Sequence, residues 1–93
     1  MKAKRASEAA TLEQIPNVGK AVAQDLRNIG ITRPEQLKGK DGLKLYHKLN
    51  KTTGARHDPC MADTLMAAVD FINGGKAKPW WKFTAKRKML LKD

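Results

Sequence analysis

The stretch from residue 12 to residue 26 constrains the fold most, because it places a tight turn between two helical segments. Pro16 cannot continue a preceding helix, since proline has no N–H and its ring clashes with the turn before it. Gly19 permits a positive φ angle or a close approach of bare backbone to a ligand. Apolar residues recur at helical spacing around and after it, at Val18, Val22, Leu26 and Ile29. The sequence therefore predicts a helix, a turn and a second helix, and we call residues 12–21 the hairpin.

The start of the second helix has the features of an anion site. The first N–H groups of a helix have no acceptor within the helix, and the helix dipole makes that end electropositive. Lys20 adds a cation beside Gly19. Oriented amides, a dipole and a cation together favour phosphate. The candidate contact residues are Asn17, Val18, Gly19, Lys20 and Ala21. The alternative is a plain corner between helices that stabilises the fold or contacts protein.

The charge balance indicates the class of partner. The chain has 19 Lys and Arg residues against 9 Asp and Glu, a formal net charge of +10. This surplus favours nucleic acid, and contacts to phosphates alone predict binding without sequence preference. An anionic membrane surface is the competitor, but we expect no membrane partner, since no run reaches the roughly 18 apolar residues of a membrane span. The candidate supporting cations are Arg27, Lys44, Lys48, Lys51 and Arg56. For each, a solvated surface position is the alternative.

The whole chain reads as one small all-α domain. No segment alternates with a period of two over a useful length, and 93 residues support one modest core. Helix start and stop signals predict five or six short helices around the hairpin: a first one capped by Ser7 or Thr11 and ended by Pro16, others near 20–29, 32–38, 42–53 and 59–73, and a last one from Thr84. Capping boxes are expected at Thr11 with Gln14 and at Thr32 with Glu35, a Schellman cap at Gly30 between Leu26 and Ile31, and a single apolar stripe along 59–73. We expect a mobile basic tail over 1–6, the helical domain over 7–75, and a basic, Trp-containing segment over 76–93 that packs on the domain.

Three stretches together resemble a known family. The hairpin (Leu12-x-x-Ile-Pro-Asn-Val-Gly-x-x-x-Ala-x-x-Leu26) resembles the helix–hairpin–helix motif, with Ala21 where a basic residue is common. Asn17 stands in place of its first glycine, and we expect it to adopt the positive φ that the turn needs, since Asn is the next-best residue for that conformation. With Arg56-His-Asp-Pro-Cys60 and Pro79-Trp-Trp-Lys82, the chain resembles the pathogenicity-locus family of small bacterial proteins, also labelled mitomycin-resistance proteins. A more distant likeness is the TfoX C-terminal domain. The resemblance implies a compact helical domain that binds DNA through hairpin amides, linked to DNA repair or processing, with no defined enzymatic activity.

The aromatic stretch near the C-terminus has two interpretations. Trp80 and Trp81 could stack on exposed bases, an interaction worth roughly 1–3 kcal/mol per base. They could instead form a lid over the small core, because aromatic rings bury large areas, and this interpretation is favoured. One ring could be buried while the other is exposed.

The chain gives little sign of chemistry. Cys60, in the first turn of a helix, could be a thiol-based site, but a capping Asp58 and a small apolar Cys60 explain the same residues. One Cys and two His give no four-ligand zinc pattern, so we predict no catalytic residue, metal or cofactor. A single Cys and the absence of an apolar signal segment indicate the cytoplasm. The competing function is a protein-interaction or adaptor module without DNA contact, and the oligomeric state stays open.

Overall fold

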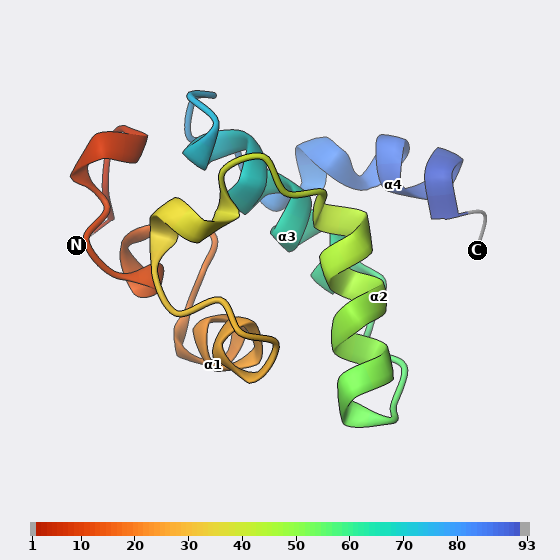
Figure 1. Cartoon of the computed structure of the whole chain (residues 1–93). Helices are drawn as coiled ribbons and strands as arrows, with labels where there is room; N and C mark the ends of the chain where they lie inside the picture. Colours follow the sequence, from red (N-terminus) through yellow and green to blue (C-terminus); the bar gives the residue numbers. More distant parts are fainter. Residues whose placement is uncertain (1, 92–93) are drawn as a thin grey trace.

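The computed structural model describes residues 2–91, and its backbone there is helical with no strand (Figure 1). The four α-helices are α1 (Lys20–Asn28), α2 (Gly42–Thr53), α3 (Cys60–Ile72) and α4 (Thr84–Leu91). Four short 3-10 helices join them: η1 (Ala6–Glu8), η2 (Leu12–Gln14), η3 (Pro34–Leu37) and η4 (Trp80–Phe83). The all-α prediction is confirmed. The expected number of helices is corrected, because the segment before Pro16 and the segment near 32–38 form only short 3-10 helices between their caps and breakers.

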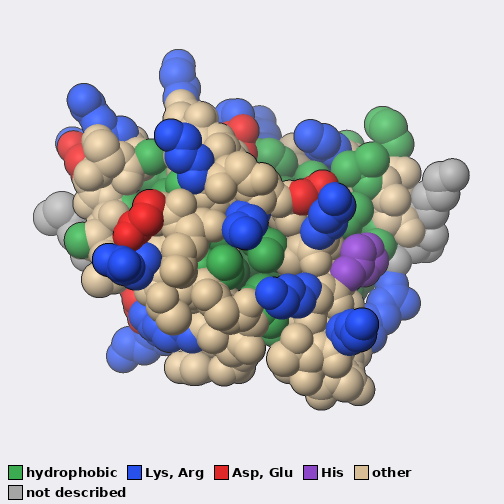
Figure 2. All heavy atoms as spheres, viewed as in Figure 1, with side chains coloured by type: hydrophobic (Ala, Val, Ile, Leu, Met, Phe, Trp, Pro, Cys, Tyr) green, Lys and Arg blue, Asp and Glu red, His purple; other side chains and the backbone are tan. Residues whose placement is uncertain are grey.

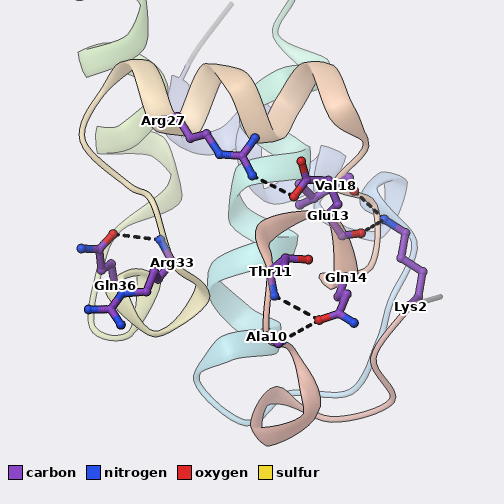
Figure 3. A network of polar contacts seen from close by, with 9 residues as sticks. All are labelled: Lys2, Ala10, Thr11, Glu13, Gln14, Val18, Arg27, Arg33 and Gln36. Carbon is purple, nitrogen blue, oxygen red and sulfur yellow. Dashed lines mark hydrogen bonds and ion pairs between the residues drawn. The ribbon is translucent and has the colours of Figure 1, made fainter.

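Local signals at the helix ends mostly act as predicted. Gln14 accepts hydrogen bonds from the N–H of Thr11, at 3.0 Å, and of Ala10, which completes the expected capping box (Figure 3). The second box lies one residue later than predicted, since Gln36 rather than Glu35 reaches back to the N–H of Arg33.

Helix α3 forms the centre of the molecule. Figure 1 shows it between the N-terminal elements and α2, and it packs against α2, α4, η1, η3 and η4. Its sequence is apolar on nearly every side, and such a helix is stable only when it is surrounded. The buried residues of α3 run almost without interruption from Ala62 to Ile72. We expected a single apolar stripe on this helix, but it is buried on nearly every side and forms the central element of the core.

The hairpin is part of the core. Leu12, Ile15 and Val18 are completely buried, together with Ala23 and Leu26 of α1. Burying three large apolar side chains contributes roughly 1.5–3 kcal/mol each to folding. The turn is therefore fixed on the domain, which sets the direction in which its backbone faces outward.

A buried ion pair fixes the C-terminal helix. The carboxylate of Asp63 on α3 is fully buried and accepts hydrogen bonds from Arg87 Nε at 2.9 Å and Thr84 Oγ1 at 2.6 Å. Arg87 is only 6% exposed. Removing one partner of such a pair usually costs about 3–5 kcal/mol, because the other charge stays buried. The pair therefore holds α4, and η4 before it, in one position on α3.

Candidate nucleic-acid interface

The hairpin turn is closed by its own backbone. The N–H of Val18 donates to the carbonyl of Ile15 at 3.1 Å, and Asn17 has φ of +73°. Proline at the second position and a positive φ at the third are the pattern of a type II turn. The prediction that Asn17 replaces the first glycine of the motif by adopting a positive φ is confirmed. Since Val18 is buried and its N–H closes the turn, Val18 is not available as a phosphate contact.

Gly19 has a different reason to be glycine. Its φ of −92° and ψ of −172° are extended, so the expected positive φ is absent. A Cβ built at Gly19 meets no atom within 4 Å, so packing within the chain does not require glycine either. Of the two roles that the sequence allowed, the positive φ is wrong, and the close approach of a ligand to bare backbone stays a prediction.

The start of α1 leaves a set of amides without helical acceptors. The first bond of the helix runs from the N–H of Ala23 to the carbonyl of Gly19, at 2.9 Å. The amides of Lys20, Ala21 and Val22 precede it, and Gly19 supplies no side-chain cap. Sequence reasoning missed the Val22 amide, although the third N–H of any helix is uncapped by geometry. Lys20 and Ala21 are exposed, so this end of α1 faces outward.

The carbonyl groups of the hairpin, unlike these amides, have hydrogen-bond partners within the chain. The ammonium of Lys2 donates to the carbonyls of Glu13, at 2.7 Å, and Val18 (Figure 3). It also donates to the carbonyl of Ile15 at 3.1 Å. Burial lowers the pKa of Lys2, and the nearby Glu13 carboxylate opposes that shift. The N–H of Ala3 also donates to Gln14. The start of the segment expected as a mobile tail therefore lies against the hairpin, where Lys2 links three of its carbonyls.

Arg27, expected as a supporting cation, serves the hairpin instead. Its Nη2 lies 2.9 Å from the Glu13 carboxylate, which joins α1 to η2 (Figure 3). This hydrogen bond lowers the pKa of Glu13 and raises that of Arg27. Arg27 is therefore removed from the set of cations available to an external phosphate.

The remaining candidate cations lie on the surface. Lys44, Lys48 and Lys51 are exposed along α2, which packs against α1, and Arg56 is exposed in the turn that follows. Figure 2 shows Lys and Arg side chains over the whole viewed face, α2 included, with few Asp and Glu among them. The positive charge is therefore spread over the helix next to α1 rather than concentrated at the hairpin.

The aromatic segment is joined directly to the hairpin. The side-chain amide of Asn17 donates to the carbonyl of Lys78 at 2.6 Å. Three residues later, Trp81 is 60% exposed, while Trp80 is half-buried, and their rings meet edge to face at 5.7 Å. The two tryptophans therefore differ in environment, and neither is fully enclosed as a lid residue would be.

The Cys60 region is organised as a helix cap. The Asp58 carboxylate accepts from the N–H of Cys60 at 2.8 Å. A separate hydrogen bond between the Cys60 side chain and Asp58 raises the pKa of the thiol, and burial adds to that shift, which opposes the thiolate needed for nucleophilic chemistry. Within residues 2–91, no group of three or more His, Cys, Asp or Glu side chains is placed to hold a metal ion. Nor is any helix in that range long and apolar enough to cross a membrane.

Comparisons with known proteins match most of the chain. The family model described as "Pathogenicity locus" matches residues 5–89. The chain is 44% identical over 85 residues to the "Mitomycin resistance protein McrB" of Streptomyces lavendulae, which covers 91% of this chain and 81% of that protein. No solved structure matches the chain.

Proposed function

The chain belongs to the pathogenicity-locus family, and from that premise we propose that it binds DNA through the phosphate backbone, without sequence preference. The N–H groups of Lys20, Ala21 and Val22 donate hydrogen bonds to a phosphate oxygen, and the Lys20 ammonium adds positive charge. The exposed lysines of α2 contribute most of the affinity at longer range. A use in DNA repair or processing is part of the same proposal, which assigns the protein no catalysis.

One observation carries this proposal: Gly19 faces open space in an ordinary extended conformation. Neither backbone strain nor packing within the chain requires glycine there. A side chain at this position would instead stand in front of the first amides of α1. A bound phosphate needs that space, and the bare backbone at Gly19 supports the proposal for this reason.

The cations of the surface support the same conclusion. Lys44, Lys48 and Lys51 are exposed at helical spacing, and the net charge of the chain is +10. Contacts of this kind to phosphates release counterions, so affinity depends strongly on salt. The hairpin sets the register of the backbone, and the basic surface supplies affinity.

A second candidate is a protein-interaction module. Met89 and Leu90 on α4 are 72% and 53% exposed, and large exposed apolar side chains on one element favour a protein contact. This candidate predicts no salt-dependent binding to DNA. It therefore differs from the first in a property that one titration measures.

The test is a titration of labelled duplex and single-stranded DNA at four salt concentrations. With about five phosphates neutralised, log affinity falls against log salt with a slope near −4 to −5. Lys20→Glu should weaken binding at least about tenfold, since it replaces the cation beside the amides with an anion. Lys38→Glu at the end of η3 is the matched control, because it changes the net charge equally outside the proposed surface.

The outcomes separate the candidates. A slope near zero for the wild type would overturn DNA binding in favour of the interaction module. Equal losses in Lys20→Glu and Lys38→Glu would show that net charge alone attracts DNA and that the hairpin is not the contact. Circular dichroism of each variant checks that the fold is retained.

A further inference from the structure

The exposed apolar surface is concentrated in one segment. In residues 2–91, the large hydrophobic side chains with high exposure are Trp81, Met89 and Leu90, and all three lie on η4 and α4. Figure 2 shows hydrophobic side chains at the surface over the end of α4. Trp81 is the aromatic member of this set, and it is 60% exposed.

Trp81 is held on a fixed base. The ring of Trp80 meets it edge to face, with an interplanar angle of 85°, and Trp80 is itself half-buried. Directly after η4, the hydroxyl of Thr84 donates to the buried Asp63 carboxylate. A mobile surface side chain would lose entropy on binding, whereas a supported ring loses less. The position of Trp81 is therefore determined before any ligand arrives.

The same segment is tied to the hairpin. The Asn17 amide donates to the carbonyl of Lys78, and three residues of extended chain span at most about 11 Å. The backbone of Trp81 is therefore linked to the hairpin turn by a short stretch of chain. The sequence from residue 71 to residue 91 contains no Asp or Glu, and Lys82 follows Trp81 directly. Because the segment that carries the ring is basic and has no acidic residue, its charge favours an anionic ligand over a neutral one.

We propose that Trp81 is a stacking platform for an unpaired nucleobase whose strand is held by the hairpin. This inference rests on the proposed function and narrows its ligand to DNA with unpaired nucleotides. In an uninterrupted duplex the bases are stacked on one another, and a surface indole has no base to contact. An unpaired base exposes its π-face, and stacking on an aromatic side chain accepts any base. Selectivity for DNA structure then arises without selectivity for sequence.

The test compares three ligands of equal length: a blunt duplex, a single strand, and a duplex interrupted by a three-nucleotide gap. We expect the wild type to bind the single strand and the gapped duplex more tightly than the blunt duplex. Trp81→Ala should weaken binding of those two ligands by roughly 5- to 150-fold, the range expected for one stacked base. Binding to the blunt duplex should stay unchanged. Trp81→Phe, which keeps an aromatic face, should restore most of the loss.

Fluorescence gives a readout that a merely structural role would not move. The chain has two tryptophans, so Trp80→Phe leaves Trp81 as its one indole. Single-stranded DNA should quench this emission, while blunt duplex at the same occupancy should not. Thermal unfolding of Trp81→Ala checks that loss of affinity does not come from loss of fold.

The failures of the two proposals are distinguishable. If duplex binding is salt-dependent and sensitive to Lys20→Glu, but Trp81→Ala binds all three ligands as the wild type does, the stacking platform is overturned and the proposed function stands. If no DNA binds the wild type, both fall, and the exposed ring then indicates a protein partner.

Discussion

Two helices of this molecule have a glycine at their start, Gly42 as the first residue of α2 and Gly19 directly before α1, and the two starts are built in opposite ways. At the start of α2, Asp41 accepts hydrogen bonds from the N–H groups of Leu43 at 2.9 Å and Lys44 at 3.3 Å. The buried Gly42 beside it lies so close to α3 that an added Cβ would be 2.6 Å from the Met66 backbone. At the start of α1, Gly19 has no capping side chain and no neighbour at its Cβ.

The difference shows that glycine allows a close helix contact at the start of α2, whereas at the start of α1 it faces open space. The amides of α2 are satisfied by their own chain, so that helix start has little capacity for an anion. The amides of α1 are unsatisfied while the carbonyls of the same hairpin are bound by Lys2. The candidate site differs from a plain corner between helices in this combination of uncapped helix amides and a turn whose other groups are hydrogen-bonded.

The largest effect should come from filling the space at Gly42. Gly42→Ala forces apart two helices at a backbone contact, and overpacking of this kind costs about 1–3 kcal/mol. Gly19→Ala is the matched control, because it adds the same methyl group in open space and should change stability by less than about 0.5 kcal/mol. Urea denaturation of both variants measures the free energies of unfolding. Equal effects at the two glycines would remove the contrast between the two helix starts.

A second substitution gives α1 the cap that α2 has. In Gly19→Asp, the carboxylate occupies the amides that we assign to phosphate, so DNA affinity should fall about tenfold or more, while stability stays equal or rises by a few tenths of a kcal/mol. Gly19→Asn separates occupancy from charge, since its amide oxygen caps equally well without the negative charge. A Gly19→Asp protein that binds DNA as tightly as the wild type would contradict the assignment of these amides.

The reverse change opens the start of α2. Asp41→Ala removes the cap and should destabilise the fold by about 1 kcal/mol. Asp41→Asn keeps a capping oxygen and makes the same change in net charge, so it should retain most of the stability. Thermal unfolding of the pair measures the cap alone. If both variants lose the same stability, charge rather than capping is what Asp41 contributes.

The smallest effect concerns the ion pair between Glu13 and Arg27, which joins the hairpin to α1. The hydrogen bond from Arg27 lowers the pKa of Glu13 in the folded state below its usual value of 4.5. A lowered folded pKa stabilises the fold above the unfolded pKa, and this contribution is lost as the pH falls through the folded value. Unfolding free energies between pH 7 and pH 3 should therefore decline less steeply in Glu13→Gln. Identical slopes would show that the ion pair is not formed in solution.

The features that sequence reasoning predicted are those determined by neighbouring residues. The end of α1 is an example: the N–H of Ile31 donates to Leu26 and that of Gly30 to Arg27, which is the Schellman cap expected from Gly30 and its flanking apolar pair. Turn chemistry likewise predicted the positive φ of Asn17. Such signals act within about six residues and do not depend on the rest of the fold.

The features that were missed depend on contacts between distant residues. Asp63 looks like an ordinary polar position on a helix, and only the arrival of α4, 24 residues later, buries it against Arg87. Arg27 was expected to face a ligand, but the fold places Glu13 beside it. The role of Lys2 was missed for the same reason. A count of charged residues gives the number of cations, but it does not show which of them bind other groups of the same chain.

The lengths of chain that separate these contacts also imply an order of assembly. The bonds of Lys2 to the hairpin close loops of 11 to 16 residues, whereas the bond from Asn17 to Lys78 closes one of 61. Short loops lose less entropy on closure and form sooner. We therefore expect the internal hydrogen bonds of the hairpin to form early in folding, while its burial waits for α3. The aromatic segment should dock last, because its bond to Asn17 closes the longest of these loops.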